Sequence, residues 1–138
     1  MEAYFISTDK SRLDIPMIHE FLSEQSYWAK GRSMETVKKS IDNSLCFGMY
    51  DEPGKQVGFA RLVTDYVVFG WLMDVFILEK HRGKGLGKKL MQYIISYPDI
   101  QHLGRIGLGT EDAHSLYQQF GFTGLKKPAN MMERLRIA

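Results

Sequence analysis

The feature that most constrains this chain is a glycine-rich turn between an apolar stretch and an amphipathic helix. Residues 71–78 are apolar except for Asp74, residues 83–87 carry glycine at every second position, and residues 86–97 repeat apolar side chains at helical spacing. Glycines have no side chains to obstruct one side of such a turn. Successive backbone N–H groups can therefore point at an anion at the positive end of the helix macrodipole. Lysine or arginine at positions 80, 82, 84, 88 and 89 adds positive charge. The pattern predicts a phosphate-binding loop.

Two widespread phosphate loops do not fit these residues. A Walker A loop would need glycine at position 82 and serine or threonine at position 89, where the chain has Arg82 and Lys89. The dinucleotide fingerprint would need its third glycine at position 88, but the residue there is Lys88 and the third glycine is Gly87. The turn therefore belongs to neither class.

The remaining pattern, Arg82-x-x-Gly85-x-Gly87, resembles the acyl-CoA pyrophosphate loop of the GNAT superfamily of N-acyltransferases. The family pattern is Gln or Arg, two residues, Gly, one residue, then Gly or Ala. The resemblance covers most of the chain, because residues 113–122 look like the closing helix and the Gly-Phe strand start of that family. It implies a single GNAT domain over residues 1–138. It also implies a mixed α/β fold whose central sheet is mostly antiparallel, with the fourth and fifth strands splayed apart.

Composition excludes several other classes of protein. A net charge of +2 among 138 residues is too small to favour nucleic acid or an anionic membrane as the main partner. Cys46 is the sole cysteine, so no internal disulfide forms, and the N-terminus shows no signal-peptide pattern. The longest apolar run, residues 67–73, is far shorter than a membrane span. We expect a cytoplasmic protein without a metal site, since the histidines and Cys46 show no metal-ligand spacing.

Periodicity and capping residues predict the order of the elements. Residues 71–78 are apolar almost without alternation, which predicts a central strand covered on both faces. Gly107 and Gly109 leave one face of the fifth strand bare, and such backbone invites close approach by a ligand. The complete prediction is strand 3–7, helix 15–24 capped by Asp14, a second helix capped by Ser33, strands 45–50, 56–66 and 71–78, a helix ended by Pro98, strand 105–110, a helix capped by Asp112 and ended by Gly121, and a final strand 131–137.

The resemblance implies acetyl-CoA as co-substrate and one continuous surface for it. In the family, a bulge in the fourth strand splays it from the fifth, and the pantetheine arm lies in the gap, which here faces residues 108–110. A backbone N–H near Ile77 would then point at the acyl oxygen. The alternative is that residues 75–78 form an ordinary core strand. The expected cofactor contacts are Phe76, Ile77, Leu78, Arg82, Gly83, Lys84, Gly85, Leu86, Gly87, Lys88 and Tyr117.

Three residues are candidates for proton transfer. Tyr117 stands where many GNAT enzymes keep a tyrosine that protonates the departing thiolate, and a phenol with a pKa near 10 suits that step. Its alternative role is to pack its ring beneath the helix. Asp74, near the expected acyl carbon, is a candidate base, although aspartate also commonly forms salt bridges or caps. His114, one helical turn before Tyr117, is the rival proton-transfer group, but a histidine there is more commonly a surface or capping residue.

The acceptor is less constrained by the sequence. Tyr27 and Trp28 lie in the loop between the first two helices, which borders the acceptor pocket in this family. They would contact an apolar or cationic acceptor, or else pack into the core at a helix end. The resemblance implies direct transfer of an acetyl group to a primary amine, on a small molecule or a peptide. A catalytically silent acyl-CoA-binding domain and a nucleic-acid binder are the alternatives. The sequence leaves open whether the final strand pairs across a homodimer.

Overall fold

Five strands form one sheet in the order β1-β2-β3-β4-β5 in the computed structural model, which describes residues 3–136. Successive strands are antiparallel except β4 and β5, which are parallel. A mixed α/β fold with a mostly antiparallel sheet is therefore confirmed. The strands are β1 (Tyr4–Ser7), β2 (Leu45–Asp51), β3 (Gln56–Thr64), β4 (Phe69–Ile77) and β5 (Arg105–Leu108).

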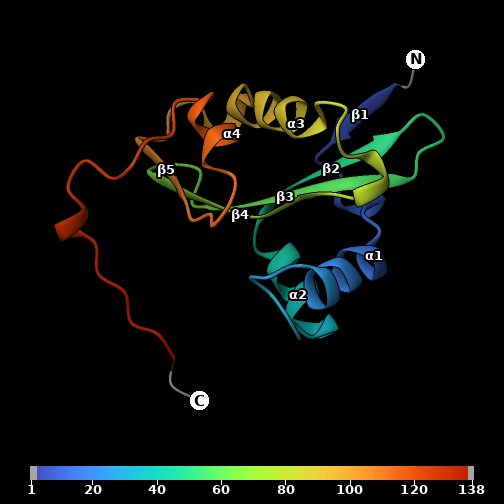
Figure 1. Cartoon of the computed structure of the whole chain (residues 1–138), viewed down its shortest axis with the longest axis horizontal. Coiled ribbons are helices and arrows are strands. Elements are labelled where there is room, and N and C mark those ends of the chain that lie inside the picture. The colour runs from blue at the N-terminus through green and yellow to red at the C-terminus, as the bar shows by residue number, and fades with distance from the viewer. Residues whose placement is uncertain (1–2, 137–138) are drawn as a thin grey trace.

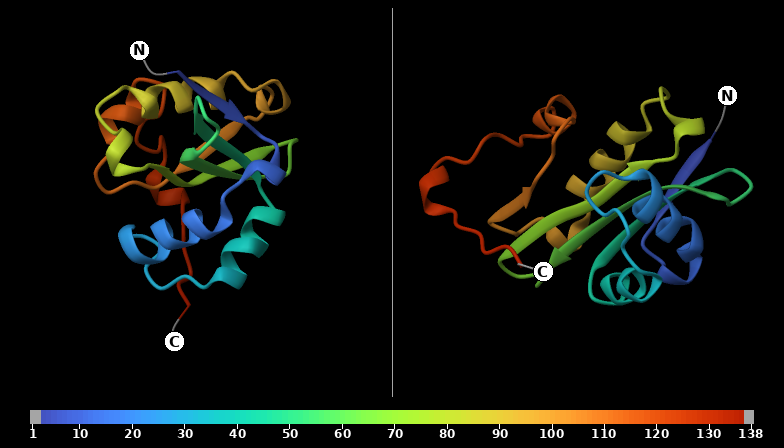
Figure 2. Two further views of the ribbon diagram at one scale, coloured as in Figure 1. Left: turned by 90° about the vertical axis from the view of Figure 1, so that its right-hand side faces the viewer. Right: turned by 60° about the horizontal axis from the view of Figure 1, so that its bottom comes forward.

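Helices cover both faces of this sheet. One face carries α3 (Leu86–Ile95) and α4 (His114–Gln118), and the opposite face carries α1 (Ile15–Glu20) and α2 (Met34–Asp42), as Figure 1 and the left view of Figure 2 show. Each layer has its own buried cluster against the sheet. Among the described residues, no helix is both long and apolar enough to span a bilayer.

A β-bulge interrupts β4 at Asp74. Phe59 of β3 pairs with Phe76, but Arg61, two residues on, pairs with Met73, so β4 carries one extra residue. Asp74 has a φ of 54°, a conformation that non-glycine residues rarely adopt. Because side chains alternate along a strand, the extra residue moves the later side chains of β4 to the opposite faces. Leu72 joins the cluster under α3 and α4, whereas Phe76 joins the cluster under α1 and α2.

Beyond the bulge, β4 and β5 separate. Their pairing covers only Phe69–Leu72 against Arg105–Leu108, so residues 73–77 of β4 have no partner on that edge. The splayed pair is therefore confirmed. The expectation that the fourth strand is covered on both faces is wrong, because every second residue from Trp71 to Ile77 is only half-buried. These half-buried residues border open space beside the sheet.

The predicted caps of the first two helices are confirmed. The Asp14 side chain accepts a hydrogen bond from the Met17 N–H at 3.1 Å, and that of Ser33 accepts one from the Thr36 N–H at 3.1 Å. After α1 the chain continues as a π-helical turn over Phe21–Gln25. The Ser26 hydroxyl then donates to the Leu22 carbonyl and accepts from the Ala29 N–H, which fixes the start of the loop before α2.

Two expectations near the C-terminus are wrong. Asp112 does not cap α4, because the N-cap is Ala113, whose N–H donates to the Thr110 hydroxyl instead. Residues 131–136 form no strand, and position 137 lies outside the described residues. A strand needs a neighbouring backbone to pair with, and Figure 1 shows this segment running away from the sheet. Gly121, with a φ of 89°, follows α4 as expected.

Candidate functional site

The glycine turn opens onto a cleft at the start of α3. Gly83 and Gly85 have φ values of 80° and 75°, and a Cβ on either would meet nothing within 4 Å. Gly85 is the N-cap of α3 and supplies no side-chain cap, so the first helical N–H groups have no side-chain acceptor from this residue. Such N–H groups, at the positive end of a ten-residue helix, suit an anion. This geometry fits the diphosphate of coenzyme A.

The basic side chains around the turn have structural contacts of their own. The Arg82 Nε donates to the Ile77 carbonyl at 3.0 Å, and the Lys89 Nζ donates to the Tyr4 carbonyl at 2.7 Å. Lys84 donates to the Tyr4 hydroxyl at 3.2 Å. These contacts tie the turn to β4 and β1, so much of the positive charge is held in place by the fold. Lys88 is exposed on the wall of the cleft.

The cleft has a volume of about 700 Å³ and runs along the unpaired edge of β4. The Leu78 N–H donates to the Val57 carbonyl of the β3 side at 2.8 Å. Because N–H directions alternate along a strand, the Ile77 N–H faces the other edge, where β5 has already ended. The predicted cofactor residues that line the cleft are Phe76, Ile77, Arg82, Gly83, Gly85, Leu86, Gly87, Lys88 and Tyr117.

Two predicted cofactor residues do not line this cleft. Leu78 packs against the cluster beneath α1 and α2, and Lys84 contacts Tyr4. The alternative that residues 75–78 form only a core strand does not describe Val75 and Ile77. Both are half-buried and line the cleft.

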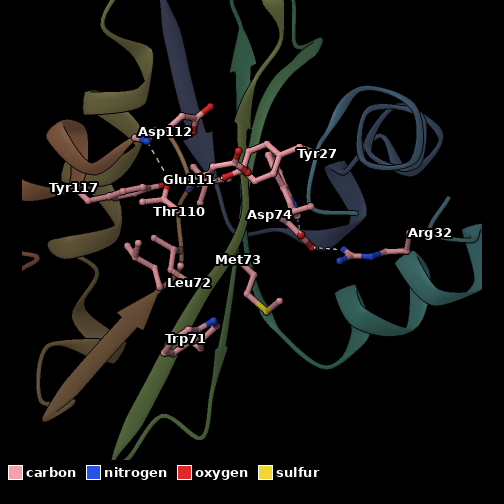
Figure 3. A pocket seen from close by; sticks show the side chains of 15 residues that line it. Tyr27, Arg32, Trp71, Leu72, Met73, Asp74, Thr110, Glu111, Asp112 and Tyr117 are labelled. Atoms are coloured by element: carbon pink, nitrogen blue, oxygen red, sulfur yellow. Dashed lines mark hydrogen bonds and ion pairs between the residues drawn. The ribbon is translucent and has the colours of Figure 1, made fainter. Parts of the chain in front are cut away.

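A second pocket, of about 570 Å³, lies against the other part of β4 (Figure 3). Its walls come from three segments that are far apart in sequence: Tyr27, Trp28 and Arg32 from the first, residues 71–75 from the second, and residues 108–113 with Tyr117 from the third. The pocket adjoins the cleft, because six residues line both: Tyr27, Trp28, Val75, Asp112, Ala113 and Tyr117. A molecule in the cleft can therefore meet a molecule in the pocket at this junction.

Tyr117 is the buried residue at the junction. Its ring packs edge-on against Phe122 with centroids 5.9 Å apart, and Figure 3 shows its side chain pointing from α4 into the pocket. Burial raises the pKa of Tyr117 to about 12, with smaller contributions from Tyr27 and Asp112. Within residues 3–136 its hydroxyl has no protein hydrogen-bond partner. The phenol is therefore neutral near pH 7 and has a proton to donate.

Asp74 is the most heavily hydrogen-bonded side chain of the site. One carboxylate oxygen accepts from the Trp28 Nε1 at 2.9 Å. The other accepts from Arg32 at 2.8 Å and from the Nε of Arg61 at 2.9 Å, and both are ion pairs. These donors come from the loop before α2 and from β3. Asp74 therefore anchors the 25–32 loop on the bulge of β4, and its role as a general base stays a prediction.

Tyr27 and Trp28 form a wall shared by the two cavities. Their side chains are 46% and 39% exposed, so the alternative that they fill the core is wrong. The Tyr27 hydroxyl accepts a hydrogen bond from the Glu111 N–H at 2.9 Å, and the two rings meet edge-on at 5.0 Å. The 25–32 loop thereby contacts β4 through Trp28 and the 108–113 segment through Tyr27.

The bare face of β5 is only partly open. A Cβ at Gly107 would collide with the indole ring of Trp71, so this glycine makes room for a side chain of the protein itself. Gly109 faces open space and lines the second pocket. The expectation of a bare strand approached by a ligand thus fails at Gly107. At Gly109 it stays a prediction.

Two further candidates lie away from these cavities. His114 is exposed at the start of α4 and lines neither of them, and its catalytic role stays a prediction. Cys46 is buried, with its Sγ 3.7 Å from the Ile41 carbonyl, and burial raises its pKa to about 11. It is a small core residue. Among the described residues, no group of three His, Cys, Asp or Glu side chains could hold a metal ion.

Sequence reasoning missed Arg32, Arg61, Trp71 and Glu111. Arg61 carried a signal, because it is a charged residue inside the otherwise apolar stretch from Val57 to Val63. A cation within such a strand predicts a buried partner of opposite charge. Nothing in the sequence around the other three residues indicated a role in the site, because the pocket is completed by segments that are distant from each of them in sequence.

Comparisons with known proteins agree on one family. The model of the acetyltransferase (GNAT) family matches residues 15–122. A crystal structure from Xanthomonas campestris pv. campestris, described as belonging to the GNAT family, is 46% identical, with a TM-score of 0.94 over 99% of this chain and 95% of that chain. Protein FG08082 of Gibberella zeae, assigned to the acetyltransferases, is 32% identical over 83% of this chain and 75% of its own length. A Bacillus subtilis (strain 168) protein named spermine/spermidine N(1)-acetyltransferase is 32% identical over 83% of each chain.

Proposed function

This chain belongs to the GNAT family of acetyltransferases, and we propose that it transfers an acetyl group from acetyl-CoA to a primary amine by direct attack. The observation that carries the proposal is the junction of the two cavities. The cleft begins at an anion-binding turn, the pocket has polar and aromatic walls, and Tyr117 lines both. Two reactants held on either side of this residue would be oriented for reaction without a covalent intermediate.

Acetyl-CoA, which supplies the activated acetyl group, would occupy the cleft. The backbone at Gly83–Gly87 and the start of α3 would bind the diphosphate, and the unpaired edge of β4 over residues 75–77 would bind the pantetheine arm. The Ile77 N–H, which faces this gap, would donate to the thioester carbonyl oxygen and stabilise the negative charge that develops there.

The proposed reaction needs one proton donor and one proton acceptor. The amine nitrogen attacks the thioester carbon, a C–N bond forms, and the C–S bond breaks. Tyr117 gives its proton to the departing thiolate, and the proton lost by the amine passes to water in the pocket. We assign to Asp74 the positioning of the 25–32 loop, because both of its oxygens are occupied by donors. Asp74 as the base is the alternative.

The proposal is tested by coenzyme A calorimetry combined with thiol release from acetyl-CoA in the presence of primary amines. Gly85→Asp places a carboxylate in the phosphate site, whereas Gly85→Asn has the same size and tolerates the same positive φ. We expect Gly85→Asp to weaken coenzyme A binding about 100-fold and Gly85→Asn to weaken it far less.

The matched control is Gly54→Asp. Gly54 also has a positive φ and open space around it, but it lies in the β2–β3 turn, so coenzyme A affinity should not change. Equal affinity of the Asp and Asn variants at position 85 would contradict the proposed diphosphate site. Coenzyme A binding without thiol release from any amine would favour the catalytically silent binding domain.

A homodimer is a separate part of the proposal. The C-terminal segment exposes Met132 by 94% and Leu135 by 71%. We propose that a second copy of the chain covers these side chains in solution. Light scattering of the whole chain should give the mass of a dimer, and the Met132→Glu/Leu135→Glu variant should give that of a monomer. A monomeric wild-type chain would exclude this part without affecting the site.

The acceptor class comes from the family as an amine, and its identity is left to experiment. The relative named for spermine and spermidine places polycationic amines among the acceptors to be tested first.

A further inference from the structure

The second pocket, where the amine is proposed to bind and which we call the acceptor pocket, carries negative charge that the protein does not balance. Asp74 forms ion pairs with both Arg32 and Arg61, whose two positive charges exceed its own charge by one. Glu111 and Asp112 line the same pocket and are exposed, and within residues 3–136 neither takes part in an ion pair. Their two negative charges outweigh that excess, so the site has a net negative charge, and this charge lies on the 111–112 wall.

Three aromatic rings line the same pocket. Tyr27, Trp28 and Trp71 all line it, and each has contacts that hold it in position. Trp71 stacks on Phe69 with centroids 6.3 Å apart and covers Gly107, while Trp28 donates to Asp74. The Tyr27 hydroxyl accepts from the Glu111 N–H, which keeps the aromatic and acidic walls together. A pocket lined by both aromatic rings and carboxylates is a favourable environment for an ammonium group.

We propose that the acceptor carries a second cationic nitrogen besides the reacting amine, and that the carboxylates of Glu111 and Asp112 bind this second centre. The inference rests on the proposed function, since it assigns the acceptor class of the same site. The reacting nitrogen must be neutral and lies beside Tyr117, whereas the second nitrogen stays protonated beside the carboxylates of Glu111 and Asp112. An acceptor with a carboxylate in place of the second nitrogen is repelled by the same wall.

Three acceptors of equal length test the charge requirement. Diaminobutane has a second cationic centre, butylamine has none, and aminobutyrate has a carboxylate instead. We expect kcat/KM for diaminobutane to exceed that for butylamine about tenfold, with aminobutyrate the poorest of the three. The preference for the diamine should shrink as salt is added, because the two carboxylates are exposed.

Variants of the wall test the assignment of residues. In Glu111→Gln/Asp112→Asn the ratio of the diamine to the butylamine kcat/KM should fall to about one. The matched control is Glu52→Gln, an exposed carboxylate in the β2–β3 turn, which should keep the wild-type ratio. Calorimetry of diaminobutane binding to the coenzyme A complex gives a readout without turnover. Binding should weaken in the double variant and not in the control.

The possible failures are distinguishable. If amines are acetylated but butylamine equals diaminobutane, or if the double variant keeps the preference, the second cationic site is wrong and the proposed function stands. If coenzyme A binds but no amine releases thiol, the proposed function fails and this inference fails with it.

Discussion

The two cavities that meet at Tyr117 are built in different ways. The cofactor cleft depends mainly on one continuous stretch, the glycine turn and the start of α3, where Gly83 and Gly85 leave open space beside the backbone. The acceptor pocket depends on side chains from three distant segments, held together by hydrogen bonds from the Trp28 indole to Asp74 and from the Glu111 N–H to the Tyr27 hydroxyl. A ligand bound by backbone N–H groups stays bound when neighbouring side chains change. By contrast, a single substitution in the acceptor pocket can change which molecules it binds. The shared chemistry of a family and the variable specificity of its members can thus occupy neighbouring cavities.

The largest expected effect comes from breaking the Asp74 anchor. Asp74→Asn keeps the shape and tolerates the positive φ, but it leaves Arg32 and the buried Arg61 without a counter-ion. We expect the free energy of unfolding to fall by about 3 to 5 kcal/mol. The KM for the amine should rise more than the coenzyme A affinity falls, because Asp74 itself lines only the acceptor pocket, although Trp28, which it holds, lines both cavities. Urea unfolding, steady-state kinetics and calorimetry measure the three quantities.

Arg61→Gln separates positioning from base catalysis at Asp74. It removes an ion-pair partner from β3 and leaves the carboxylate itself intact. If Asp74 positions the loop, this variant should also raise the amine KM and lower stability. If Asp74 acts as the base alone, Asp74→Asn would reduce kcat at nearly wild-type stability, and Arg61→Gln would leave the amine KM unchanged.

Tyr117→Phe tests the junction itself, which belongs equally to both cavities. Removing the hydroxyl should reduce kcat by about 100-fold or more, because a general acid typically contributes that much. Coenzyme A affinity should change by less than about twofold, since the ring keeps its packing against Phe122. The control is Tyr93→Phe, at an exposed tyrosine of α3 that lines neither cavity. An unchanged kcat in Tyr117→Phe would remove the proposed acid.

The raised pKa of Tyr117 predicts that wild type and Tyr117→Phe differ in the pH dependence of their stability only in alkaline solution. Burial raises this pKa from its usual value of 10 to about 12, so the folded protein retains the phenolic proton longer than the unfolded chain does. The stabilisation linked to this group is fully present below pH 10 and is lost as the pH rises from 10 to about 12. Between these limits Tyr117→Phe should lose less stability than wild type. A loss of kcat below pH 10 must come from another group. Tyrosinate absorbance and unfolding curves across this range test both statements.

The smallest expected effect lies outside both cavities. Within residues 3–136, the Tyr50 hydroxyl is buried without a hydrogen-bond partner. It lies in the space over Gly48, where a Cβ would collide with it. Tyr50→Phe removes the unpaired group and keeps the ring, so stability should rise by roughly 1 kcal/mol with both binding constants unchanged. Tyr50→Leu, which also removes the stacking with Phe5, should lower stability instead. Urea midpoints distinguish the two outcomes.

The helices and the phosphate loop could be predicted because their causes are local. Asp14 and Ser33 cap helices through N–H groups three residues away, and Gly85 begins α3 because only a few residues tolerate its φ. The prediction of the α4 cap was wrong although its cause is also local. Asp112 and Thr110 both offer an acceptor near the start of the helix, and the Thr110 hydroxyl is the one that accepts from the Ala113 N–H.

The sequence by itself determined the order of the elements up to α4, the position of the anion-binding turn and the family resemblance. Only the tertiary structure decided that Asp74 sits on a bulge and bonds partners 46, 42 and 13 residues away. It alone brought Trp71, Tyr27 and Glu111 to one pocket, and it left residues 131–136 without a strand partner. The physical reason is that caps and turns satisfy backbone groups within a few residues of themselves. Buried charges and pocket walls take their partners from whichever distant segment the sheet brings beside them.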